Sequence, residues 1–177
     1  AIYEQIYAPF AQGTPLLNCG PIAPGPYCND AFADTYDPAG AETILTDAGW
    51  TKGADGMWAD ADGNVPEIRW MVNTGNTRRE STQEFLIPKL AEAGFNVKAD
   101  NCEALPCVFE TRLPSLDYDM AMYINTVAPD PAYLRTWGCD QIPTEENDFQ
   151  GQNSNGWCNE EATTQLIAAD AELDEAK

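Results

Sequence analysis

The clearest structural signals of the chain lie in YDPAGAETILTDAGW at residues 36–50 and in DGMWADADGNVPEIRWMVNTG at residues 55–75. Asp37-Pro38 predicts a helix start, because Asp caps free N–H groups and proline suits the first helical position. Apolar residues then recur at helical spacing, and Gly49 ends the helix. The apolar stripe consists of Ala41, Ile44, Leu45 and Ala48.

Turn dipeptides and a strand follow this helix. Asp55-Gly56 and Asp62-Gly63 lie on either side of a short run that contains Trp58, which predicts a hairpin. Residues 68–72 are rich in β-branched and aromatic side chains and predict a strand. Asp60 and Asp62 also suggest a calcium loop, but the twelve-residue pattern with its closing Glu is not met. We therefore interpret this segment as a turn, with calcium as the alternative.

A second helix is expected from Thr77 to Ala93, because Thr77 and Glu80 match a capping box and Gly94 ends the pattern. Pro88 should bend or split this helix. Further strands are expected at about 95–100 and 118–124, and further helices from Pro106, Asp130 and Asn159. Strands that alternate with helices predict an α/β layer with largely parallel pairing, a parallel sheet flanked by helices.

The size and charge of the chain fit one acidic globular domain. The chain has 177 residues, 44% of them hydrophobic and 10% aromatic, enough to bury a core. Nine basic against 29 acidic residues give a net charge of −20, which argues against nucleic acid as a partner. Because the chain has no histidine, a Ser-His-Asp or Cys-His arrangement cannot form within it. We assign no catalytic residue, no metal and no cofactor, although a carboxylate pair of a glycosidase stays formally open.

The six cysteines predict disulfides rather than a metal site. None of them forms the C-x₂-C pair that an all-cysteine zinc site needs. Each neighbouring pair flanks a turn-rich segment, and the even count indicates an oxidising compartment outside the cytoplasm. Six cysteines allow fifteen pairings, so the connectivity is a prediction. The predicted pairs are Cys19–Cys28, Cys102–Cys107 and Cys139–Cys158.

The ordered motifs of the chain resemble the extracellular solute-binding proteins of ABC importers, in the oligopeptide/dipeptide-binding group, family 5. The motifs are the two stretches quoted above, LAEAGFNVKAD at 90–100, DYDMAMY at 117–123, Asp130-Pro131, and QNSNGWCNEEATTQLI at 152–167. The resemblance implies an α/β fold that is the C-terminal lobe of a two-lobed, type II periplasmic-binding-protein-like protein. Residues 1–177 are then a single ligand-binding lobe, a fragment of a longer protein, with 1–36 as a Pro/Gly-rich lead-in.

The resemblance also implies a function, partners and a location. The function is non-catalytic capture of a solute, a small peptide or an oligosaccharide-like molecule, by closure of two lobes. The partners are ABC permease subunits, and the protein itself is a monomer. The location is the extracellular face of a bacterial cell membrane, through a lipid anchor in the full-length protein, or the periplasm. The rival from another class is a secreted carbohydrate-active enzyme or its carbohydrate-binding accessory domain.

The candidate ligand site follows the strand expected at 118–124, because ligands of open α/β sheets bind beyond the carboxyl ends of the strands. Peptide-binding members of the family carry an acidic residue here that pairs with the amino terminus of the ligand. That position falls at Ala128 or at Asp130, so another polar solute stays open. Trp137 and Trp157 are further candidates for ligand contact. The expected cleft residues are Asn125, Thr126, Asp130 and Tyr133.

Overall fold

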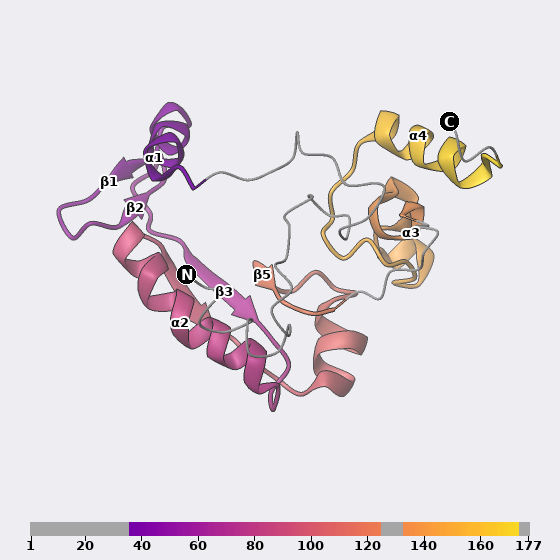
Figure 1. The fold of residues 1–177 in the computed structure, drawn as a ribbon, viewed down its shortest axis with the longest axis horizontal. Coiled ribbons are helices and arrows are strands. Elements are labelled where there is room, and N and C mark those ends of the chain that lie inside the picture. Colours follow the sequence, from indigo (N-terminus) through magenta and orange to yellow (C-terminus); the bar gives the residue numbers. More distant parts are fainter. Residues whose placement is uncertain (1–35, 125–132, 174–177) are drawn as a thin grey trace. The chain divides into compact units, whose positions relative to one another are not determined.

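The computed structural model describes residues 36–124 and 133–173, which form two compact units. Unit 1 contains the described residues up to Trp70 together with Gly75–Asp100. Unit 2 contains Met71–Thr74 together with the described residues from position 101 onward. The helices and strands of both units are labelled in Figure 1.

Unit 1 begins with the helix α1, Pro38–Asp47, whose start confirms the prediction at Asp37. The Asp37 carboxylate accepts a hydrogen bond from the backbone N–H of Gly40 at 2.9 Å, which satisfies one of the free donors of the first turn. The apolar stripe of α1 packs less than its pattern suggested. No residue of α1 is buried in the described part of the chain, and the Ile44 side chain is 71% exposed.

The predicted hairpin is present and contacts the end of the second helix. Strands β1, Thr51–Lys52, and β2, Trp58–Ala59, pair antiparallel across the Asp55-Gly56 turn. Trp58 is buried, and its indole Nε1 donates a hydrogen bond to the Ala93 carbonyl at 3.1 Å. Gly94 has φ 100°, and a Cβ there would lie 2.6 Å from the Gly56 carbonyl oxygen. Glycine is therefore required where the hairpin meets the helix end.

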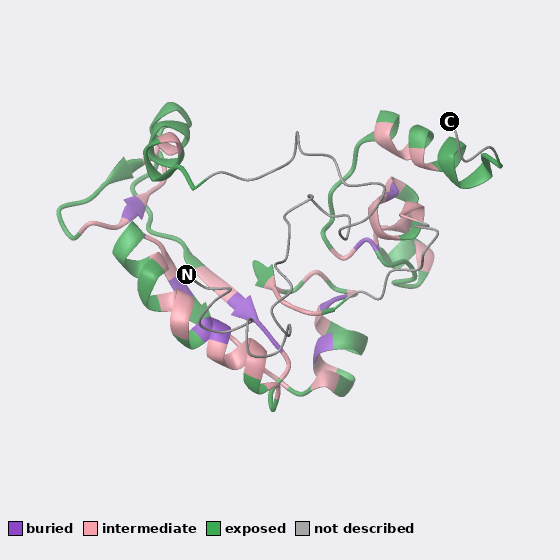
Figure 2. Cartoon of the chain, viewed as in Figure 1, coloured by how far each residue is buried: buried purple, intermediate pink, exposed green. Residues whose placement is uncertain are grey.

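The central strand of the chain is β3, Glu67–Met71, which pairs in parallel with β4, Asn96–Ala99. The strand order in this three-stranded sheet is β4-β3-β5. Helix α2, Thr77–Ala93, makes the crossover between the two parallel strands and packs against β4 (Figure 1). The buried Gln83 of α2 donates a hydrogen bond to the Trp70 carbonyl at 2.7 Å. Buried residues accordingly gather on β3 and on the facing side of α2 (Figure 2).

The predicted N-cap of α2 was wrong, and of the two outcomes predicted at Pro88, a bend or a split, the split does not occur. The N-cap is Asn76 rather than Thr77: its side chain accepts the capping hydrogen bond, while the Glu80 carboxylate accepts one from the Gly75 N–H at 3.1 Å. Both Asn and Thr are good caps, so their order alone did not decide the start. Pro88 lies inside one unbroken helix and does not split it. A lost N–H bond in a helix of 17 residues is tolerated here because the helix packs on the sheet.

Unit 2 has its own core around the end of β3. Met71, Val108 and Leu113 are buried there, and Val108 belongs to the helical segment η3, Ala104–Arg112. Strand β5 covers only Met120–Ala121, where the backbone N–H of the next residue donates to the Met71 carbonyl at 3.0 Å. Partly buried side chains that pack against this core are Cys102, Tyr118, Ala121 and Tyr123.

The buried strand expected over 118–124 is thus two residues long and half exposed. The strand begins only at Met120 because a tight turn at Leu116 precedes β5. Leu116 has φ 54°, and its carbonyl accepts a hydrogen bond from the Tyr118 N–H at 3.0 Å. The Arg112 guanidinium fastens this turn by donating from Nε and Nη2 to the Asp117 carbonyl, at 2.9 and 2.7 Å.

The remaining helices of unit 2 are α3, Leu134–Trp137, and α4, Glu160–Ala171, with the short helical turns η4, Cys139–Gln141, and η5, Glu145–Asn147, between them. Asn159 caps α4 as predicted, because its side chain accepts a hydrogen bond from the Ala162 N–H at 2.9 Å. The helix start expected at Asp130 lies outside the described residues. Across residues 36–124 and 133–173, no helix is long and apolar enough to cross a membrane.

Candidate functional site

A pocket of about 280 Å³ lies beside β5 within unit 2. One wall comes from the turn before β5 and from β5 itself, and the other comes from the loop that leads toward α4. The tight turn at Leu116 and the short strand therefore place the pocket. Its lining residues are Leu116, Tyr118, Asp119, Ala121, Tyr123, Ser154 and Asn155.

Tyr118 joins the two walls of the pocket. Its phenol O–H donates a hydrogen bond to the Ser154 carbonyl. Burial, with a smaller contribution from Tyr123, raises the pKa of Tyr118 to about 12, so the phenol is neutral near pH 7. The Tyr123 ring is itself held edge-on by Phe109, with ring centroids 6.2 Å apart. The pocket thus combines aromatic surface with hydroxyl, amide and carboxylate groups, a mixture that suits a polar organic solute.

The titration of Tyr118 can be tested directly. Its folded pKa of about 12 lies above the unfolded value of about 10, so the folded chain binds more protons between these pH values. The neutral phenol therefore contributes stability that is present below pH 10 and is lost as the pH rises toward 12. In Tyr118→Phe this part of the pH dependence should disappear. Ultraviolet absorbance of tyrosinate, subtracted between parent and variant, checks it; a step centred near pH 10 would contradict the burial argument.

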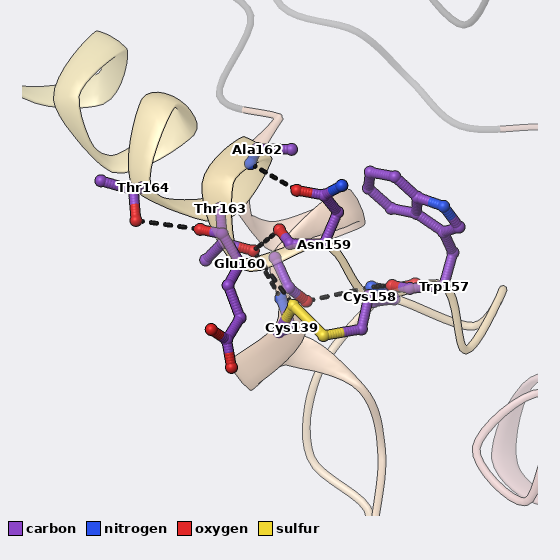
Figure 3. Close-up of a disulfide and its surroundings, with 10 residues drawn as sticks. Cys139, Trp157, Cys158, Asn159, Glu160, Ala162, Thr163 and Thr164 are labelled. Atoms are coloured by element: carbon purple, nitrogen blue, oxygen red, sulfur yellow. Dashed lines mark hydrogen bonds between the residues drawn. A yellow bond between two sulfur atoms is a disulfide. The ribbon is translucent and has the colours of Figure 1, made fainter.

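A disulfide supports the loop wall of the pocket at its far end. Cys139, at the start of η4, is bonded to Cys158, just before the capping residue of α4 (Figure 3). The hydroxyl of Thr163 in α4 accepts a hydrogen bond from the Cys139 N–H at 3.1 Å. Next to this bridge, Trp137 and Trp157 pack edge to face, with centroids 6.2 Å apart and planes at 80°. These two rings stabilise the junction, and Trp157 also stays partly accessible.

Two of the three predicted disulfides are present in the part of the chain that the structure describes. They join Cys102 to Cys107 and Cys139 to Cys158, five and 19 positions apart. Cys19 and Cys28 lie outside the described residues, so their pairing stays a prediction.

The cleft residues predicted from the sequence fall mostly outside the described residues, namely Asn125, Thr126 and Asp130. Tyr133 is described; it directly precedes α3, and its carbonyl accepts hydrogen bonds from the backbone N–H groups of Thr136 and Trp137, both at 3.0 Å. It is not one of the residues that line the pocket. A common role of Asn125, Thr126, Asp130 and Tyr133 in ligand contact therefore stays a prediction.

Sequence reasoning did not identify the pocket residues Tyr118, Asp119, Ser154 and Asn155. Residues 118–123, in the motif DYDMAMY, were interpreted as a buried strand with an aromatic residue at each end, and the ligand site was expected after that strand. Ser154 lies 36 positions further along the chain, and only the tertiary fold brings its carbonyl to Tyr118.

The turn at Asp60 is held by hydrogen bonds among its own residues. The Asp60 carboxylate accepts hydrogen bonds from the backbone N–H groups of Asn64 and Asp62, at 2.9 and 3.0 Å. These bonds, that of Asn64 foremost, hold the pKa of Asp60 below its usual value. Within the described ranges, no three His, Cys, Asp or Glu side chains group closely enough to hold a metal ion.

The fold defines a class: a partial lobe of a type II periplasmic binding protein. The chain superimposes on an oligopeptide-binding protein from Thermus thermophilus, solved with a pentapeptide, with a TM-score of 0.79 and 26% identity. Residues 1–142 match the sequence profile of bacterial extracellular solute-binding proteins, family 5 Middle. The chain belongs to this family, as its motifs suggested.

Other solved structures agree on the fold. An oligopeptide-binding protein from Bacillus subtilis, in complex with a nonapeptide, gives a TM-score of 0.81 at 22% identity. A mannohexaose-bound protein from Thermotoga maritima, described as a periplasmic oligopeptide-binding protein, gives 0.76 at 19%. Each alignment covers 99% of this chain, but only 31%, 34% and 34% of the Thermus, Bacillus and Thermotoga chains. The chain therefore spans about a third of the length of these proteins. No curated protein sequence matches it.

Proposed function

We propose that this chain is part of the solute-binding component of a bacterial ABC importer, and that it captures a peptide or another polar solute without catalysis. The observation that carries the proposal is the family match over residues 1–142. It is supported by the 26% identical Thermus structure, an oligopeptide-binding protein in complex with a pentapeptide. The rival function, a carbohydrate-active enzyme, has no support from any of these relatives.

The pocket beside β5 is the part of this chain that we assign to solute contact. Tyr118 and Tyr123 offer aromatic surface, while Asp119 and Asn155 supply a carboxylate and an amide at the same place. A peptide presents the matching groups, since its backbone and termini need hydrogen-bond partners and its side chains need apolar surface. An oligosaccharide would use the same aromatic faces, and mannohexaose in the Thermotoga relative keeps this as the second solute class.

The partners and the location follow from the same proposal. Two lobes close around the solute, and the closed protein docks on membrane permease subunits. The family description places its members outside the cell, which fits the two disulfides seen here. We propose a monomer at the outer face of the membrane, held by a lipid anchor in the full-length protein, or free in the periplasm.

The predicted cleft residues give a binding test in the longer protein. Asn125→Ala or Thr126→Ala removes one hydrogen bond to a neutral group, which typically contributes about 0.5–1.5 kcal/mol. The affinity for the solute should therefore fall severalfold to about tenfold. Isothermal calorimetry with penta-alanine as the probe measures this.

The matched control is Asn64→Ala, in the turn after β2 and outside the pocket lining. We expect it to leave the affinity unchanged, while all three variants keep the unfolding transition of the parent. If Asn125→Ala and Thr126→Ala both bind penta-alanine as the parent does, these two residues are not part of the cleft.

A further inference from the structure

We propose that Asn153 is a positioning residue that holds Ser154 and Asn155 against Tyr118 and thereby fixes the loop wall of the pocket. The inference rests on the proposed function only for the claim that this pocket contacts solute. The positioning itself is a statement about contacts within unit 2, and it can be tested without a ligand.

Asn153 is the hydrogen-bonding centre of its loop. Its side chain is 0% exposed, and its amide Nδ2 donates to the Gly138 carbonyl at 3.0 Å and to the Trp157 carbonyl at 2.8 Å. Its backbone N–H donates to the Gln141 carbonyl at 3.0 Å, and its carbonyl accepts from the Gly156 N–H at 3.3 Å. A single buried residue thus ties the loop to both ends of η4 and closes the turn that follows.

The loop also lies directly against η4. Gly151 has φ 120°, and a Cβ at this position would overlap the Gln141 carbonyl group. The Cys139–Cys158 disulfide links the end of the same segment to η4. The loop therefore contacts η4 or its flanking residues at Gly151, at Asn153 and at Cys158. Few conformations remain for the residues between these points.

Ser154, the residue that follows Asn153, connects the loop to the pocket. The Ser154 carbonyl accepts the hydrogen bond of the Tyr118 phenol, and Ser154 and Asn155 are the only residues of the loop that line the pocket in the described structure. Asn153 is itself not part of the lining. It can act on the pocket only by holding Ser154 and Asn155 in place.

The chemistry of the Asn153 amide suggests a nearly isosteric test. Among the described residues its Oδ1 accepts no hydrogen bond, so its side chain acts through its two N–H donors. Asn153→Asp keeps the shape but turns these donors into an oxygen that faces two carbonyl oxygens. Asn159→Asp makes the same change in charge six positions away, at a helix cap where Asp serves as well as Asn.

The readout is the titration of Tyr118 in the 177-residue chain, obtained as the difference in tyrosinate absorbance between each variant and the same variant with Tyr118→Phe. We expect the Tyr118 step to move from about pH 12 toward about pH 10 in Asn153→Asp, because the phenol loses its partner and its burial. In Asn159→Asp the step should stay in place. The melting temperatures should also be non-additive: Asn153→Asp with Tyr118→Phe should lose less than the sum of the single losses.

An unmoved Tyr118 step in a cooperatively folded Asn153→Asp variant, or additive losses in melting temperature, would overturn the positioning role. If Asn153→Asp does not unfold cooperatively, Asn153→Ser, which keeps one hydroxyl donor, replaces it in both the titration and the comparison of melting temperatures. Binding of penta-alanine by the longer protein separates the two proposals. If Tyr118→Phe and Asn153→Asp leave binding unchanged while the Tyr118 step still moves, the positioning role stands and the pocket is rejected as the solute site.

Discussion

Replacing Met71 by alanine is expected to lower the free energy of unfolding of the chain by about 2–5 kcal/mol. Met71 is 1% exposed and lies at the end of β3, where Val108 and Leu113 pack around it. Its truncation removes buried apolar surface and leaves a cavity that the surrounding backbone can fill only in part. The Met71 carbonyl also accepts a hydrogen bond from the N–H of Met122, directly after β5. The cavity therefore lies next to the strand that lines the pocket.

The control for this substitution is Met120→Ala, which makes the same chemical change on β5 at a side chain that is 36% exposed. Because part of this side chain is already exposed, its truncation should lower stability clearly less than that of Met71. Denaturant unfolding followed by circular dichroism measures both variants. Equal losses in the two variants would show that Met71 is not the centre of the core of unit 2.

Removal of the Cys139–Cys158 disulfide by Cys139→Ser with Cys158→Ser has the second large expected effect, a loss of about 3 kcal/mol. The bridge closes a loop between positions 19 apart, and in the chain-entropy model such a loop restricts the unfolded chain by about that amount. The same loop contains Asn153 and Ser154, so the folded state should lose order at the pocket wall as well.

The matched variant is Cys102→Ser with Cys107→Ser, whose bridge spans only five positions. The same model gives about 2 kcal/mol for so short a loop. We expect the Cys139–Cys158 pair to cost more, measured by denaturant unfolding of the two serine variants. The opposite ranking would mean that native packing around Cys102, rather than loop length, decides how much each bridge stabilises.

Local signals in the sequence predicted the local structure well. Asp37-Pro38 and Asn159 each cap a helix through a hydrogen bond three residues away, so a short window holds all the information that is needed. The same kind of signal failed at Thr77, because two capping residues stand side by side and the window cannot rank them. The split that Pro88 was expected to cause is absent for a different reason, since the packing of α2 on the sheet overrides the local preference.

The site could be predicted only in part, because its contacts join distant segments. The sequence directed attention to the segment after the strand expected at 118–124, most of which lies outside the described residues. The pocket is lined instead by the turn before β5, by β5 with its flanking residues, and by the loop that contains Ser154. Which residues form it depends on the turn at Leu116, where a non-glycine residue has positive φ, and on the loop fastened by Asn153. Neither feature has a signature within a short window, whereas the family resemblance, which uses the order of motifs along the whole chain, was confirmed.

Solute capture, as we propose it, requires two lobes, and this chain contributes part of one of them. A cleft between lobes encloses its ligand from both sides, and a single lobe leaves apolar ligand surface wet at roughly 25 cal/mol for each Å² left uncovered. The direct measurement is calorimetry of penta-alanine with the 177-residue chain and with the longer protein. We expect the chain alone to unfold cooperatively and to bind with a millimolar dissociation constant or not detectably, and the longer protein to bind much more tightly. Micromolar binding by the 177-residue chain alone would show that the site lies wholly within it and would contradict the two-lobe account.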